Sequence, residues 1–415
     1  MGILASGVGI AKIIGLLATP IITRIYSPAD FGVLAIFTTV ILLVVPLSTL
    51  FYSITIPLPK TAGIAMNIVV LCSAFIFAVT TILSVSFFLF GDVIFGIFNM
   101  EEIAAYWWLL IIGIFAASFY DLMTHWATRT KSFVQVAKTK VWQASAGAII
   151  NIGLGLLGMK PLGLLIGVVS KKGGGVISLF RSFINDFKNN ISSVKIKRIY
   201  LLLRYYVEFP IYRLPSQFIM KLSGQIPVLF FAYHFSQEET GQLGLSLSLI
   251  GLPISLLGSS TGQAFYANVS RISINNSVKI YEVTRSVIKR LILFSLLPFI
   301  ILFTLSPVLF GFIFGNEWYV AGEFTSILSI YLLFQFMYSP IGNSIFNVYK
   351  EQSKVFILNL LRVALVISVF FTSILIDLNP YNTLWLYAVV LSIYYIISTY
   401  IVFRVIKSNI IQHEK

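Results

Sequence analysis

Two adjacent lysines stand inside an apolar stretch of the sequence, LIGVVSKKGGGVISLF, and three glycines follow them. An ammonium group costs about 2.5–3.5 kcal/mol at the centre of an isolated membrane helix, so such a position usually serves a function. Lys171 and Lys172 could bind an anion such as a phosphate, and the glycines could let the backbone unwind so that its amides also reach the anion. The alternative is a helix that breaks at the glycines, with the cytoplasm reaching up to the lysines.

The composition indicates that these lysines lie in a membrane protein. Of the 415 residues, 58% are hydrophobic and only 11% are charged, and the mean hydropathy is +0.93. A water-soluble chain could not cover so much apolar surface with so few charges. The apolar runs are about 20 residues long, which predicts spanning helices rather than the short alternating strands of an outer-membrane barrel. We therefore predict an all-α integral membrane protein.

The sequence carries no pattern typical of a metal site or an enzyme. Its single cysteine, Cys72, allows no internal disulfide. Its three histidines lack the spacing of metal ligands and accompany no nucleophile motif. We expect no metal, no cofactor and no enzymatic activity.

Hydropathy and helix-breaking residues predict about twelve spans. Most of the 29 basic residues fall in the connections on one side of these spans, while acidic residues prevail on the other side. The positive-inside rule then places both termini in the cytoplasm. Because the net charge of +14 is mostly this topology signal, we expect no nucleic-acid partner. The predicted spans are 6–26, 32–53, 64–90, 104–123, 140–158, 161–180, 211–233, 241–262, 290–312, 321–346, 355–376 and 384–404.

The two halves of the sequence share a pattern. TPIITRIYSPADFG and QIPVLFFAYHFSQEETG each contain a proline, then a serine with an acidic residue three positions later, then a glycine. The serine and the acid can cap the free amides of a new helix and place negative charge at its positive end. The capping residues are Ser27, Asp30 and Gly32 in the first half and Ser236, Glu239 and Gly241 in the second.

This repeat in the same orientation predicts two pseudo-symmetric six-helix lobes around a central cavity. We expect an N-terminal lobe over 1–180, a basic cytoplasmic linker over 181–210 and a C-terminal lobe over 211–415.

Basic residues inside the predicted spans indicate a polar interior. Besides the two lysines, Lys12 and Lys221 lie deep and are expected to face it. Arg24, near the outer end of the first span, could bind substrate or simply extend to the interface, and Arg362 is expected to extend to the interface. The residues expected to line a cationic, substrate-binding lumen are Lys171, Lys172, Lys12, Lys221, Arg213 and Arg24.

Two acidic residues could neutralise these cations. Glu208 is near Arg213 in the sequence, so the two could form an ion pair at the inner interface. Asp121, near the inner end of the fourth span, could pair with a cation of the lumen or carry a coupling proton.

The stretch from Arg204 to Tyr266 resembles the signature region of the bacterial polysaccharide repeat-unit exporters, the O-antigen flippases of the Wzx type. It contains FP-x-Y, QIP-x-L, GLP-x-SLLG and GQ-x-F in that order, and ITRIYSPADFGVLAIF is similar to the N-terminal signature of the same group. The resemblance covers most of the chain. The Lys-Lys-Gly-Gly-Gly sequence departs from the family pattern, so its role is not inherited.

The resemblance implies a flippase within the multidrug/oligosaccharidyl-lipid/polysaccharide superfamily. Such a protein would move undecaprenyl-diphosphate-linked oligosaccharide repeat units from the cytoplasmic to the periplasmic leaflet by alternating access of two lobes, for O-antigen or related lipopolysaccharide synthesis. The implied partners are the lipid-linked sugar diphosphate and membrane lipid, together with a polysaccharide polymerase and a chain-length regulator.

Two other functions remain as alternatives. A multidrug or cation antiporter of the same superfamily would bind cationic drugs and would be expected to have an acidic interior. A membrane-embedded O-antigen polymerase or ligase would be expected to have a large periplasmic loop with functional arginines. The predicted spans are rich in basic residues and the predicted outer loops are short, so the flippase is favoured.

Overall fold

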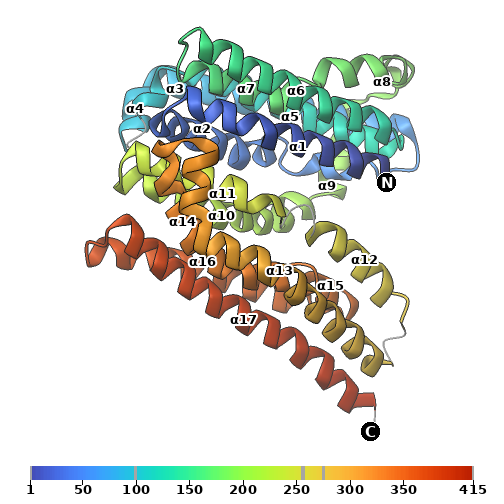
Figure 1. Ribbon diagram of the computed structural model, residues 1–415. Helices are drawn as coiled ribbons and strands as arrows, with labels where there is room; N and C mark the ends of the chain where they lie inside the picture. The colour runs from blue at the N-terminus through green and yellow to red at the C-terminus, as the bar shows by residue number, and fades with distance from the viewer. Residues whose placement is uncertain (1, 98–100, 254–257, 273–275, 414–415) are drawn as a thin grey trace. The chain divides into compact units, whose positions relative to one another are not determined.

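The structure, a computed structural model, describes residues 2–97, 101–253, 258–272 and 276–413 (Figure 1). Helices are the only regular elements in these ranges, which confirms the predicted all-α class. Contacts divide the chain into two compact units, Met1–Gly241 and Gln242–Lys415.

The first unit is coloured blue to yellow-green in Figure 1. A 3₁₀ turn over Tyr52–Thr55 follows its second helix, and a π-helical turn over Phe209–Arg213 precedes its tenth. Its helices are α1 (Gly2–Ile25), α2 (Pro28–Leu47), α3 (Ala62–Ile97), α4 (Glu101–Ala104), α5 (Trp107–Arg129), α6 (Phe133–Leu156), α7 (Leu162–Gly173), α8 (Val176–Asn190), α9 (Ile196–Tyr205), α10 (Leu214–His234) and the start of α11 (Gln237–Pro253).

The second unit contains the remainder of α11 and the helices coloured yellow to red in Figure 1. They are α12 (Ser259–Val269), α13 (Ser277–Phe314), α14 (Tyr319–Tyr338), α15 (Gly342–Val348), α16 (Gln352–Leu375) and α17 (Pro380–His413).

Nine helical stretches in the described ranges are long and apolar enough to cross a membrane. The helices α6 and α10 have the length of a span, but polar residues lower their hydropathy. The predicted span 241–262 falls on α11 and α12 and includes residues 254–257, which lie outside the described part. Each of the other predicted spans has a helical counterpart, and α7 and α8 together occupy the sixth.

The boundary between the units differs from the expected one. The helix α10 belongs to the first unit because it packs against α2: Thr39 Oγ1 donates a hydrogen bond of 2.8 Å to Gln225 Oε1, and Ala232 joins the apolar core around Phe37. The segment expected to be a linker is also folded onto this unit. Leu179 and Phe183 of α8 are buried in its second apolar core, where α9 also packs.

Both predicted helix caps form. The backbone N–H of Ser27 donates to Asp30 Oδ2 at 2.8 Å, and the backbone N–H of Asp30 donates back to Ser27 Oγ at 3.3 Å. Ser236 and Glu239 repeat the arrangement, at 2.9 and 3.1 Å. Each pair satisfies amides that the first helical turn would otherwise leave without partners, so the capping pattern that the sequence repeats forms at both places.

The helices that begin at these caps approach each other through two glycines. A Cβ atom on Gly32 would lie 2.2 Å from the carbonyl oxygen of Gln237, and one on Gly241 would lie 1.8 Å from that of Pro28. Real Cβ atoms do not come so close to a carbonyl oxygen. The contact is reciprocal, since each glycine meets the residue at the start of the other helix, so α2 and α11 touch backbone to backbone here.

Candidate functional site

The two lysines lie in the last turn of α7, which ends at Gly173. A new helix, α8, begins at Val176, so the helical span is interrupted at Gly174 and Gly175. The helix therefore breaks at the glycines, as the alternative interpretation of the sequence expected, although both glycines keep right-handed helical backbone angles.

The glycines after the lysines let α7 approach α5 and α6 closely. A Cβ atom on Gly173 would lie 2.2 Å from Cβ of Ala116 in α5. One on Gly175 would lie 2.5 Å from the ring of Tyr120 and 3.1 Å from Nε2 of Gln143. Close helix contacts through small residues are common in membrane proteins. The glycines therefore hold the lysine-bearing end of α7 against both neighbouring helices.

Four lysines of the first unit form one electrostatic cluster. Electrostatic repulsion links Lys172 to Lys171, to Lys140 and to Lys221, the last of which is exposed. Lys171 and Lys172 come from α7, Lys140 from α6 and Lys221 from α10. In the described part of the chain, none of the four forms an ion pair with a carboxylate within 4 Å. We call these residues the lysine cluster.

The lysine cluster is held by one face of α6. Lys140, Gln143 and Gly147 recur at spacings of three and four residues, which places them on the same side of the helix. The aliphatic part of Lys171 packs at Gly147, where a Cβ atom would lie 2.4 Å from Cγ of the lysine. Lys140 Nζ lies 4.4 Å from the ring centre of Tyr120, a cation–π contact.

Asp121 lies beside the lysine cluster rather than in an ion pair with it. Its Oδ2 is 3.5 Å from His125 Nε2 one turn along α5 and accepts a 3.5 Å hydrogen bond from Ser53. It also attracts Lys140 electrostatically. The cluster therefore keeps a surplus of positive charge, which suits an anion.

Gln143 is a residue that the sequence reasoning missed. Its side chain is buried, yet neither Nε2 nor Oε1 has a hydrogen-bond partner. Buried amides are nearly always paired, so an unpaired one next to a cationic cluster indicates a site for water or a polar ligand. A sequence signal existed in the polar run Lys138-Thr139-Lys140 followed by Gln143 inside a helix of span length.

We expect Gln143→Leu to raise the unfolding temperature and to lower export of surface polysaccharide. Leucine removes the cost of an unsatisfied buried amide, about 1–3 kcal/mol, and also removes a polar group from the candidate site. Thermal unfolding in detergent and polysaccharide staining of whole cells measure the two effects. Gln135→Leu, on an exposed part of α6, is the matched control. A fall in the unfolding temperature would show that the amide is paired within the native protein.

The other residues expected in the lumen are more scattered. Lys12 is partly exposed on α1, and Arg24 is exposed in the last turn of the same helix. Arg213 is exposed at the end of the π-helical turn, 5.9 Å from the ring centre of Phe209. Glu208 precedes that turn and is not within 4 Å of Arg213. The structure links Lys171, Lys172 and Lys221 electrostatically with Lys140, whereas Arg213 lies against the ring of Phe209.

The side chain of Arg362, in the second unit, was expected to extend to the membrane interface, but the structure places it elsewhere. It lies among buried tyrosines, with its guanidinium 5.8 Å from the ring centre of Tyr395. Its Nε has no hydrogen-bond partner. The sequence did not reveal this environment because the tyrosines come from α14 and α17, far along the chain.

Comparison with solved structures identifies the fold. The chain matches the lipid II flippase MurJ in an inward closed conformation, with a TM-score of 0.70 at 16% identity, over 100% of this chain and 90% of MurJ. It also matches a multidrug resistance MATE family transporter of the MOP superfamily in its inward-facing conformation, with a TM-score of 0.68 at 13% identity, over 95% of this chain and 94% of that one. The protein therefore has the fold of the MOP superfamily of membrane transporters.

A family model described as polysaccharide biosynthesis protein matches residues 21–323. The chain belongs to this family, and the resemblance found between Arg204 and Tyr266 is confirmed. A comparison with curated proteins gave no significant match.

Proposed function

We propose that this protein is a flippase for polyprenyl-diphosphate-linked oligosaccharides, the repeat units of O-antigen or a related surface polysaccharide. The supporting observation is the lysine cluster: four ammonium groups without a carboxylate within 4 Å, inside a unit built from membrane-length helices. A diphosphate cannot cross hydrocarbon unaided, and a cationic site is what it requires. The family match to polysaccharide biosynthesis proteins supports the same substrate class.

In this proposal the lysine cluster binds the diphosphate, which is common to all repeat units, and the sugar occupies the surrounding space. Lys171 is fixed at Gly147 and Lys140 at Tyr120, so both ammonium groups are held near the ligand before it binds. Such pre-ordering reduces the entropy lost on binding. The unpaired amide of Gln143 can supply a neutral donor to a phosphate oxygen.

The charge distribution supports an inner-membrane location with both termini in the cytoplasm. Substrate would then enter from the cytoplasmic leaflet, where nucleotide-sugar enzymes assemble it. A polysaccharide polymerase and its chain-length regulator would consume the product in the periplasm.

Deleting the gene is expected to remove surface polysaccharide and to leave undecaprenyl-diphosphate-linked repeat units in the cytoplasmic leaflet. Extraction of lipid-linked sugars, with and without enzymatic access from outside spheroplasts, measures both changes. Restoring the gene on a plasmid should reverse them. Unchanged polysaccharide together with increased drug susceptibility would instead support the multidrug antiporter.

A further inference from the structure

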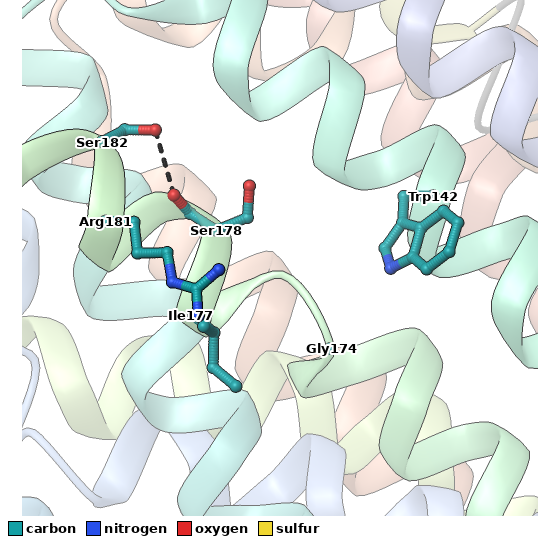
Figure 2. A pocket seen from close by; sticks show the side chains of 6 residues that line it. All are labelled: Trp142, Gly174, Ile177, Ser178, Arg181 and Ser182. Carbon is teal, nitrogen blue, oxygen red and sulfur yellow. Dashed lines mark hydrogen bonds between the residues drawn. The ribbon is translucent and has the colours of Figure 1, made fainter.

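An open groove of about 590 Å³ lies between α6 and α8, apart from the lysine cluster. Trp142 lines one side, and Ile177, Ser178, Arg181 and Ser182 line the other, as Figure 2 shows. The groove begins at Gly174, where the helical span is interrupted. It therefore combines a guanidinium, hydroxyl groups and an interfacial aromatic ring within one unit.

The polar side of the groove carries an uncompensated positive charge. Arg181 is exposed, and no carboxylate of the described residues lies within 4 Å of it. Ser182 Oγ donates a 3.0 Å hydrogen bond to the carbonyl oxygen of Ser178, so this hydroxyl oxygen can still accept a bond, and the Ser178 hydroxyl also faces the groove. A guanidinium with nearby hydroxyls matches the oxygens of a phosphate group.

The apolar side of the groove continues along α6. Trp142, Ile149, Gly153 and Leu156 recur at spacings of seven, four and three residues, so they share one helix face. The three side chains are 64%, 70% and 73% exposed, and a Cβ atom on Gly153 would meet nothing within 4 Å. This stripe runs from the groove for most of the length of α6. Its length and exposure fit a hydrocarbon chain lying against the helix.

We propose that the groove binds an anionic phospholipid, with its phosphate on Arg181 and one acyl chain along the α6 stripe. Tryptophan commonly lies at the depth of lipid headgroups, which is where a phosphate bound at Arg181 would place Trp142. A single guanidinium balances a phosphodiester with one negative charge, whereas a diphosphate matches the lysine cluster better. The proposal does not depend on the transported substrate.

The test uses the full chain reconstituted in phosphatidylcholine vesicles in which one lipid in five is phosphatidylglycerol. In one sample the phosphatidylglycerol carries brominated acyl chains, and in a second sample an equal amount of the phosphatidylcholine does. Bromine quenches the fluorescence of nearby tryptophans. The difference between the wild-type protein and Trp142→Phe isolates the Trp142 signal. One arginine near an anionic lipid should enrich it about fivefold over the bulk membrane, so brominated phosphatidylglycerol should quench this signal more strongly than the same amount of brominated phosphatidylcholine.

Arg181→Gln should abolish the stronger quenching by phosphatidylglycerol. For this variant the Trp142 signal is the difference between Arg181→Gln and the double variant Arg181→Gln/Trp142→Phe. Arg198→Gln removes an equal charge from the exposed face of α9 and should retain the preference. Equal quenching by both lipids in the wild-type protein overturns the proposal. Loss of the preference when undecaprenyl diphosphate is added in an amount equal to the protein also overturns it, because the groove would then belong to the substrate lipid.

Discussion

Lys172→Met is expected to reduce export of surface polysaccharide roughly tenfold to a hundredfold without reducing the amount of protein in the membrane. Lys172 is the member of the lysine cluster that interacts with all three others. Losing one charged hydrogen bond to a phosphate costs about 1.5–3 kcal/mol of binding free energy. This energy corresponds to a loss of affinity of roughly tenfold to a hundredfold. Folding should not suffer, because the substitution removes a repelling charge from the membrane interior.

Quantitative staining of surface polysaccharide, normalised to the membrane protein detected by immunoblot, measures this effect. Replacing both Lys171 and Lys172 with alanine should abolish export, and Lys172→Arg should retain part of it because the charge remains. Lys138→Met removes a charge from an exposed position on α6 and is the matched control. Normal export by a well-expressed double-alanine protein would show that these charges do not bind the substrate.

Gly173→Ala is expected to destabilise the first unit by about 1–3 kcal/mol, the usual cost of overpacking. The new Cβ would lie 2.2 Å from Cβ and 2.9 Å from the carbonyl carbon of Ala116, so α7 and α5 must separate. Because the adjacent Lys172 would shift with the helix, export should fall as well. Thermal unfolding of the purified protein in detergent measures the loss of stability.

Two further variants test whether the contact with Ala116 causes the loss of stability. Ala116→Gly in the Gly173→Ala background should restore part of the stability, since it removes the Cβ contact and leaves the backbone contact. Gly9→Ala, at a position where a Cβ meets nothing within 4 Å, should leave stability unchanged or raise it, because alanine favours the helix. If Gly173→Ala unfolded at the wild-type temperature, α7 and α5 would not pack as described.

Local features of the fold were predictable from the sequence. The caps at Ser27 and Ser236 formed as expected, because a capping box depends only on residues three positions apart. The apolar runs likewise gave the spanning helices, because length and hydropathy are properties of a single segment. The packing of α8 and α9 against the first unit could not be predicted in this way. Both helices are amphipathic, and an amphipathic pattern is equally typical of a linker exposed to solvent.

The candidate site was predictable only in part, because a site depends on which helices become neighbours. Lys171 and Lys172 were recognisable as charges within an apolar run, whereas Lys140 is the first residue of the predicted span 140–158, where a basic residue is ordinary. Gln143 drew no attention because an uncharged amide is tolerated in a span. Its burial without a partner depends on the approach of Gly175, a tertiary contact between segments distant in sequence.

The reciprocal contact of Gly32 and Gly241 has an evolutionary consequence. A half-length ancestor that paired with a second copy of itself would have needed only one such glycine, because symmetry would have supplied the other. In a single gene that carries both halves, the two positions can mutate separately. The contact still requires both, since a Cβ on either would strike the opposite carbonyl at Gln237 or Pro28. Because a side chain at either position breaks the same contact, homologues should keep or lose this pair of glycines together.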